Sequence, residues 1–95
     1  MSKHEYFVLS YETSPTFLQM RSTDRSAIEL LISETKQLVP KCDVMDLTFN
    51  AEVRIDHLSN QDKKIYIQLL QILCHNGWEP YAGDYSRTYL RLNYD

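Results

Sequence analysis

The chain has 95 residues, a length that suits one hydrophobic core and is too short for two, so we expect a single domain over residues 1–95. Its hydrophobic fraction of 43% excludes a disordered chain, and its formal net charge of -3 excludes binding to nucleic acid or anionic lipid through bulk positive charge. Cys42 and Cys74 are too few for a disulfide framework, and neither a membrane-spanning apolar run nor a signal peptide is recognisable, so we expect a cytoplasmic protein without membrane insertion.

Two strands are predicted at the beginning of the chain. Tyr6 to Leu9 form a continuous β-prone run, and because both of its faces are apolar, it predicts a strand near the middle of a sheet. A turn follows at residues 13–15, and residues 16–21 form the second predicted strand. The short connection favours an antiparallel hairpin.

The next segment, residues 24–39, is predicted to be a helix. Its apolar residues recur with a period near 3.6: Ile28, Leu31, Ile32, Leu38 and Val39. Ser26 and Glu29 have the spacing of a capping box, but Asp24 caps an earlier start equally well. Pro40 ends the helix because it disfavours helical geometry at the preceding residue.

Residues 45–56 show the clearest strand pattern. Apolar side chains alternate with polar ones along this stretch: Met45, Leu47, Phe49, Ala51, Val53 and Ile55. A two-residue hairpin inside it would reverse the phase, so the alternation favours one long strand, or two segments joined by a bulge or an odd-length loop, with these apolar side chains on one face. A break near Asn50 is the alternative that the pattern leaves open.

A second helix is predicted to begin at Ser59, Asn60 or Asp62. It ends at Asn76-Gly77, because glycine readily adopts the left-handed conformation that closes a helix. Its buried seam is Ile65, Leu69, Ile72 and Leu73, widened by Tyr66, Ile67 and Leu70.

A terminal hairpin is predicted from residues 78–81 and 85–94, joined by the three-residue loop Ala82-Gly83-Asp84. The predicted order of elements is therefore β-β-α-β-α-β-β. This order indicates an α+β fold, with a single mostly antiparallel sheet and two helices packed on one face.

The end of the second helix resembles part of a known family. Leu69-Leu70, followed by Asn76-Gly77-Trp78-Glu79 and a tyrosine-rich strand, is similar to the tail of a family of small uncharacterised bacterial domains, whose members carry a helix that ends in Gly-Trp-Glu before a final strand. The resemblance covers the last third of the chain. It implies a helix-to-strand arrangement at this end, and it supplies no catalytic residues because that family has no established activity.

Neither a metal site nor a catalytic motif is recognisable in the sequence. The candidate metal ligands lack the paired spacing of known sites: His4, Cys42, His57, Cys74 and His75. Cys74 is instead expected to be a small buried or half-buried residue of the second helix. The chain has no Gly-x-Ser-x-Gly motif, and two glycines do not make a phosphate-binding loop, so we expect no metal, no cofactor and no enzymatic activity.

The last predicted strand carries the candidate binding residues. Tyr85, Arg87, Tyr89 and Arg91 alternate along it, so they project from one face of the sheet. Tyrosine and arginine are enriched at binding hot spots, because they bury a large area and donate hydrogen bonds. The alternative is that Tyr85 and Tyr89 pack beneath a helix as part of the core.

The sequence therefore favours a non-enzymatic protein–protein interaction or regulatory (adaptor) domain that acts through a sheet edge or through this Tyr/Arg face. A homodimer is the simplest partner, because 12% aromatic residues is more than so small a core encloses. One alternative is a regulator that binds single-stranded nucleic acid or a nucleotide on the same face, but Asp84, Asp95 and the net charge make nucleic acid the less favoured partner. A small enzyme, with a site assembled from distant residues, is the third class.

Overall fold

The computed structural model describes residues 3–13, 16–55, 62–84 and 86–94. The described residues form one six-stranded sheet with strand order β3-β4-β2-β1-β6-β5, in which all neighbouring strands are antiparallel, and two helices. In chain order the elements are β1 (Lys3–Thr13), β2 (Thr16–Ser22), α1 (Arg25–Leu38), β3 (Cys42–Asp46), β4 (Asn50–Ile55), α2 (Asp62–His75), β5 (Glu79–Asp84) and β6 (Arg87–Tyr94).

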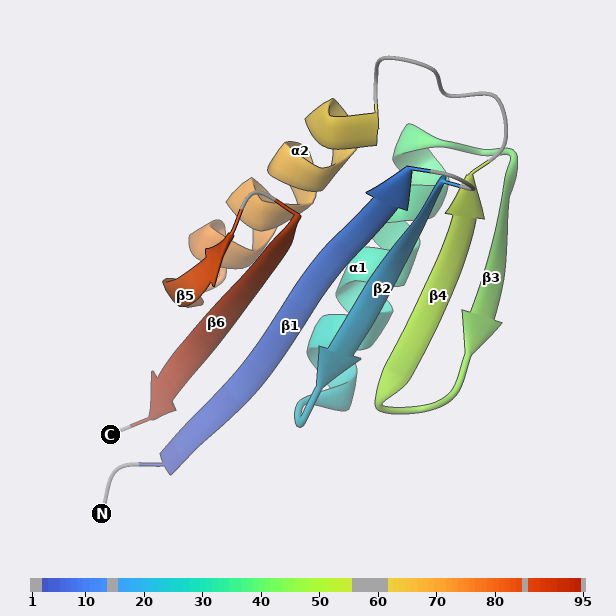
Figure 1. Cartoon of the computed structure of the whole chain (residues 1–95). Helices are drawn as coiled ribbons and strands as arrows, with labels where there is room; N and C mark the ends of the chain where they lie inside the picture. The colour runs from blue at the N-terminus through green and yellow to red at the C-terminus, as the bar shows by residue number, and fades with distance from the viewer. Residues whose placement is uncertain (1–2, 14–15, 56–61, 85, 95) are drawn as a thin grey trace.

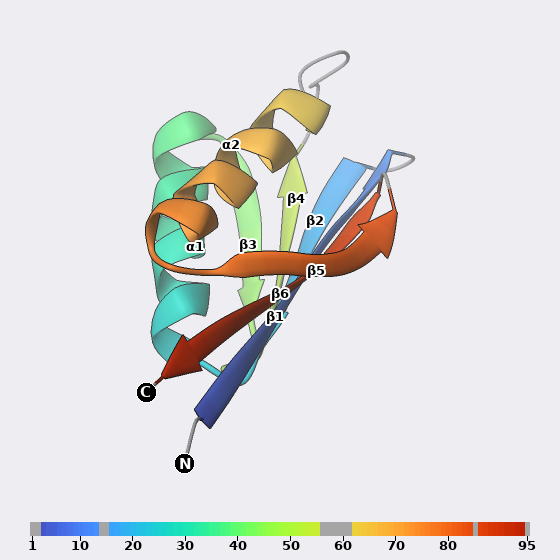
Figure 2. The same cartoon turned by 90° about the vertical axis from the view of Figure 1, so that its left-hand side faces the viewer.

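Both helices lie on the same side of the sheet. Figure 1 looks onto the uncovered side, with the helices behind the strands, and Figure 2 shows the two layers from the edge. The predicted α+β fold, with an antiparallel sheet and two helices, is thus confirmed, but the described residues form six strands where the sequence predicted five. The N-terminal strand β1 lies in the middle of the sheet, between β2 and β6, as its two-sided apolarity predicted.

The core lies between the sheet and the helices. Alternate residues of the strands point toward the helices and are fully or almost fully buried, and residues of both helices meet them: Phe7, Leu9, Leu18, Met20, Ile28, Leu31, Val53, Leu69, Leu73 and Leu90. Trp78, just after α2, is also buried and packs edge-on against Phe7 with ring centroids 5.7 Å apart. The residues between these core positions therefore point to the uncovered side of the sheet.

The helix α1 is capped at the earlier of the two predicted N-cap positions. The Asp24 carboxylate accepts hydrogen bonds from the Ser26 N–H at 3.0 Å and from the Ser26 hydroxyl at 2.6 Å. Asp24 is therefore the N-cap, and the capping-box arrangement of Ser26 and Glu29 is not formed. The helix ends at Leu38, before Pro40, as predicted.

Residues 42–55 form a hairpin, not one long strand. The Leu47 N–H donates to the Asn50 carbonyl at 2.7 Å, which leaves Thr48 and Phe49 as a two-residue turn. Such a turn reverses the phase, so Met45 lies opposite Glu52 on the uncovered side while Ala51, Val53 and Ile55 are buried. The prediction that the apolar residues share one face is wrong for this reason: Met45, Leu47 and Phe49 are 57%, 57% and 52% exposed.

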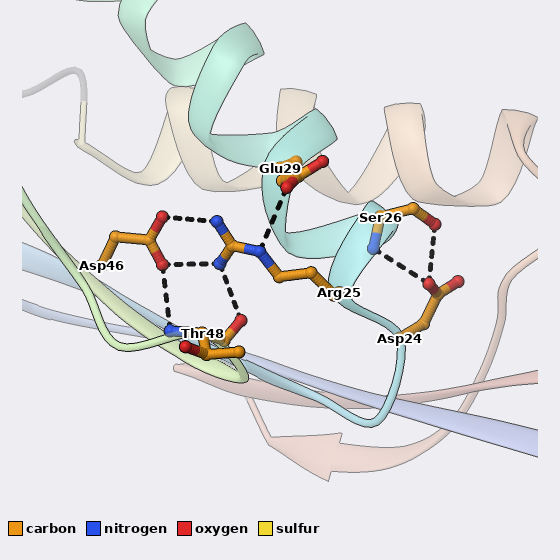
Figure 3. A network of polar contacts seen from close by, with 6 residues as sticks. All are labelled: Asp24, Arg25, Ser26, Glu29, Asp46 and Thr48. Atoms are coloured by element: carbon orange, nitrogen blue, oxygen red, sulfur yellow. Dashed lines mark hydrogen bonds and ion pairs between the residues drawn. The ribbon is translucent and has the colours of Figure 1, made fainter.

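A network around Arg25 holds this turn in place (Figure 3). The Arg25 guanidinium donates to both carboxylate oxygens of Asp46 at 2.5 and 2.6 Å, to the Thr48 carbonyl at 2.7 Å and to Glu29 at 3.2 Å. The Asp46 carboxylate also accepts from the Thr48 N–H, and the hydrogen bond from Arg25 lowers the pKa of Asp46. Thr48 has a φ of 72°, which a β-branched residue rarely adopts, and these contacts fix it there.

Three further predictions need correction. The predicted buried face of α2 includes Ile67, but this residue is 44% exposed because it lies on the side of the helix that turns away from the sheet. Cys74 was expected to be buried or half-buried and is exposed on the same side. The strand β5 continues through Ala82 and Gly83 to Asp84, where Gly83 pairs with Thr88, so these residues belong to a strand and not to a connecting loop.

Candidate interaction face of the sheet

The side of the sheet that no helix covers is called the open face below. Cross-strand pairing fixes which residues share it: Arg87 lies opposite Ser10, Ser10 opposite Gln19, and Gln19 opposite Glu52. Further described members follow by alternation along each strand and by pairing: Tyr6, Val8, Glu12, Phe17, Arg21, Asp43, Met45, Asn50, Arg54, Asp84, Tyr89 and Arg91.

The structure brings three of the four predicted binding residues together on this face. Leu90 and Thr88 point toward the helices, so Arg87, Tyr89 and Arg91 point away from them. Tyr89 is half-buried and lies opposite Val8 on the open face, so it does not pack beneath a helix. Tyr85 lies outside the described residues.

Two more tyrosines join Tyr89 on the open face. The ring of Tyr81 lies 6.3 Å from that of Tyr89 and 6.4 Å from that of Tyr6, measured between centroids. The Arg91 guanidinium lies over the Tyr81 ring at 5.5 Å. Tyr6 is 44% and Tyr81 50% exposed, which is a large apolar area to leave in water.

The sequence reasoning missed both of these tyrosines. For Tyr6 a signal exists, because it alternates with the core residues Phe7 and Leu9 and must therefore face the other side. For Tyr81 no local signal exists, since its place depends on how β5 pairs with β6, where the register shifts between Pro80 and Ala82.

The arginines of the chain fall into two groups. Arg25 forms ion pairs with Asp46 and Glu29 that stabilise the turn between β3 and β4. The other four arginines of the sequence lie on the open face: Arg21, Arg54, Arg87 and Arg91. Within the described part of the chain, none of these four forms an ion pair, so their charges are available to a partner.

The immediate surroundings of Arg87 and Arg91 differ. A hydrogen bond with the Tyr89 side chain raises the pKa of Arg87, and the nearby carboxylates of Asp84 and Glu12 raise it further. The Nε of Arg91 is buried and has no hydrogen-bond partner among the described residues. The side chain of Arg91 is thus held against Tyr81 by ring contact and not by a carboxylate.

The open face is hollowed in two places. A hollow of about 330 Å³ lies over the β3 side and is lined by Phe17, Asp43, Val44, Met45, Glu52 and Arg54. A smaller hollow of about 150 Å³ is lined by Val8, Gln19, Arg21, Asn50, Arg87 and Tyr89. The first is lined by two carboxylates and one guanidinium group, while the second is lined by two guanidinium groups and no carboxylate.

The described residues of the open face supply guanidinium groups and aromatic rings, which are groups suited to binding. Among residues 3–13, 16–55, 62–84 and 86–94, no three histidine, cysteine or acidic side chains are placed to hold a metal ion. Cys74 and His75 line a separate hollow on the outer side of α2, of about 330 Å³, whose other lining residues are Ile67, Leu70 and Gln71. This lining contains no carboxylate to orient the histidine, and His57 lies outside the described residues.

No protein-family model matches the sequence, and no curated protein matches it significantly. The resemblance of its C-terminal third to a bacterial domain family therefore stays a prediction. The fold is similar to that of a conserved kinetoplastid-specific protein from Trypanosoma cruzi, with a TM-score of 0.52, 12% sequence identity, and coverage of 95% of this chain and 92% of that one. At this identity the likeness concerns the fold alone. No helix within the described ranges is long and apolar enough to cross a membrane.

Proposed function

We propose that this chain is a non-enzymatic protein-interaction domain, of the regulatory or adaptor kind, which binds a protein partner on its open face. The observation that supports this proposal is the placement of the arginines. Four guanidinium groups that form no ion pair with described residues lie on the one side of the sheet that the helices leave uncovered. Beside them are tyrosines that are about half exposed, and arginine and tyrosine are the residues most enriched where proteins bind one another.

The face is a better candidate than either sheet edge. The edge strand β5 contains Pro80, which has no N–H to donate, and its pairing is irregular between Pro80 and Ala82. The opposite edge strand, β3, is only five residues long. Both features weaken the backbone hydrogen bonding of an added strand, whereas neither of them affects binding on the open face.

A protein partner also suits the charges of the face better than a polyanion. Asp43 and Glu52 line the hollow on the β3 side, and Glu12 lies near Arg87. A nucleic-acid strand carries a negative charge at every phosphate and so meets these carboxylates with like charge. A protein can place acidic, basic and apolar groups one by one against such a mixed surface.

Single-stranded nucleic acid is a second candidate because of one specific feature, the cluster of Tyr6, Tyr81 and Tyr89 with Arg91 over a ring. Exposed aromatic rings beside guanidinium groups stack on bases and contact phosphates. The test is binding of a fluorescent oligothymidylate at low and physiological salt. Affinity that falls steeply with salt and is lost in Arg87→Ala and Arg91→Ala would favour this candidate, and no binding at low salt would eliminate it.

Site-specific photo-crosslinking tests the main proposal. A photoreactive phenylalanine analogue replaces Tyr89 on the open face or, as a control, Ile67 on the outer side of α2, which is the more accessible of the two at 44% exposure. We expect discrete protein adducts from position 89, identified by mass spectrometry, and none of the same adducts from position 67. The proposal fails if position 89 gives no protein adduct, or if both positions give the same ones.

A further inference from the structure

We propose that Asn76 and Gly77 form a site of self-modification, at which the asparagine side chain condenses with the following peptide nitrogen and is converted to isoaspartate. The folded end of α2 keeps this pair unreactive, and the conversion, once it has occurred, detaches Trp78 from the core. This inference goes beyond the proposed function and does not depend on it. It is argued from the residue types at the end of α2 and from the contacts that hold them.

An asparagine followed by glycine carries both reacting groups of this modification in its own chain. The backbone nitrogen of Gly77 loses its proton and attacks the side-chain carbonyl carbon of Asn76, so that a new C–N bond forms while the side-chain amide nitrogen takes up a proton and leaves as ammonia. Water then opens the resulting succinimide ring at either of its carbonyl carbons. One opening gives aspartate, and the other gives isoaspartate, whose main chain runs through the side-chain carbon and is longer by one methylene group.

Glycine after asparagine favours the reaction, because no side chain hinders the nitrogen and the backbone rotates freely. The other three asparagines of the sequence are followed by alanine, glutamine and tyrosine. Gly77 is nevertheless required by the fold, since its φ is 93° and an added Cβ would lie 3.1 Å from the Cδ1 atom of Leu92. The cap of α2 thus depends on the same glycine that makes Asn76 reactive.

Hydrogen bonds keep the two reacting groups apart in the folded chain. The Gly77 N–H donates to the Cys74 carbonyl at 3.1 Å, so the attacking nitrogen is already engaged. The side-chain amide of Asn76 donates to the Ile72 carbonyl at 2.8 Å, which holds the group under attack against the last turn of the helix. Nitrogen and carbonyl carbon therefore meet only when this turn opens.

Trp78 secures the turn from the side of the core. Its N–H donates to the Leu73 carbonyl at 3.0 Å and, with the bond from Gly77, completes a Schellman motif. Its ring is 3% exposed and packs edge-on against Phe7 with centroids 5.7 Å apart. Opening the turn requires the loss of these contacts, so the reaction depends on local unfolding at the end of α2.

Conversion to isoaspartate prevents the turn from closing again. The added methylene group lengthens the main chain between α2 and Trp78, so the Schellman hydrogen bonds and the contact with Phe7 are not restored together. A carboxylate also replaces the amide at the C-terminal end of the helix, where negative charge is unfavourable. The variant Asn76→Asp introduces the carboxylate without the longer main chain and so separates the two effects.

Peptide mapping by mass spectrometry measures the reaction at Asn76. The full chain is incubated in mildly alkaline buffer, either folded or unfolded in guanidinium chloride, until half of the unfolded sample is converted. We expect the folded chain to react at least about 30-fold more slowly, because two backbone hydrogen bonds and the burial of Trp78 are lost when the turn opens. Asn50, which alanine follows, is the internal control and is expected to keep its amide in both samples.

The fluorescence of Trp78, the one tryptophan of the sequence, measures the consequence. The isoaspartyl chain is separated by chromatography from the aspartyl and unconverted chains, and all three are refolded by removal of the denaturant. We expect a red-shifted emission and stronger quenching by acrylamide for the isoaspartyl chain. Asn76→Asp and the unconverted chain are expected to keep the emission of a buried tryptophan.

An Asn76 amide that persists in the unfolded chain overturns the inference, and so does a folded chain that reacts as fast as the unfolded one. An isoaspartyl chain whose Trp78 emission equals that of the wild type overturns the link between the modification and the core. A red shift of the same size in Asn76→Asp overturns the role of the longer main chain, because it assigns the effect to charge. Protection by folding together with a shift confined to the isoaspartyl chain supports the inference.

Discussion

The phenolic hydroxyl of Tyr66 joins α2 to two strands of the sheet, and replacing this residue with phenylalanine removes that link alone. The hydroxyl lies 3.2 Å from the carbonyl oxygen of Leu9 on β1 and 2.6 Å from the hydroxyl of Thr88 on β6. The ring itself is buried and would keep its place. Each hydrogen bond contributes about 0.5 to 1.5 kcal/mol net, so we expect Tyr66→Phe to lower the free energy of unfolding by about 2 kcal/mol.

For a domain of this size, a loss of about 2 kcal/mol lowers the Tm by roughly 8 to 16 °C. Urea titration followed by circular dichroism, together with a thermal melt, measures both quantities at neutral pH. Tyr81→Phe is the matched control, because it removes the hydroxyl of a tyrosine that is half exposed on the open face. An unfolding free energy for Tyr66→Phe equal to that of the wild type would refute the role assigned to the hydroxyl.

Tyr66→Phe also changes how the free energy of unfolding depends on pH in the alkaline range. Burial raises the pKa of Tyr66 above its ordinary value of 10.0, and the hydrogen bond with Thr88 opposes this only in part. The unfolded chain therefore loses the Tyr66 proton first, so the wild type loses stability as the pH rises from about 10 through the folded pKa. The phenylalanine variant lacks this loss, and its stability falls less steeply by up to about 1.4 kcal/mol per pH unit. Identical slopes above pH 10 would contradict the reasoning.

Other substitutions test separate parts of the structure. Leu69→Ala should lower the free energy of unfolding by about 2 to 5 kcal/mol, because the side chain is fully buried. Tyr89→Ala should weaken partner binding more than folding, and an equal loss of stability from both variants in urea titrations would place Tyr89 in the core. Thr48→Gly should raise the unfolding free energy by about 1 kcal/mol, since glycine adopts a positive φ without strain, and a lower value in the same assay would argue against strain at this turn. Asp24→Ala should lower the free energy of unfolding by about 1 kcal/mol, and Ser26→Ala should lower it by clearly less. If Ser26 were the N-cap instead, melting curves would show the larger loss for Ser26→Ala.

The elements of the fold were largely predictable because their signals are local. The helix α1 ends before Pro40, α2 ends just before Gly77, whose φ is 93°, and β1 is a central strand. The turn between β3 and β4 was not predictable from its own residues. Leu47, Thr48 and Phe49 include none of the glycine, asparagine or aspartate that favour tight turns, and the conformation depends on contacts with Arg25, more than 20 residues away along the chain.

The candidate site was predictable only along a single strand. Alternation within β6 was enough to place Arg87, Tyr89 and Arg91 on one face. That Arg21 and Arg54 share this face follows from the register of β2 with β1 and with β4, which no short-range pattern encodes. The place of Asp43 on the open face likewise depends on the phase reversal at Thr48, which turns this side chain away from the helices.

The position of β1 in the middle of the sheet has a consequence for how the chain reaches this structure. Its two neighbours lie far apart in the sequence, since β2 follows β1 at once while β6 is the last of the six described strands. Until residues 87–94 leave the ribosome, Tyr6 to Leu9 present an apolar strand with unpaired backbone groups along one side, which is a template for aggregation. A messenger truncated after α2 should therefore yield insoluble protein, even though most of the core residues have already been synthesised.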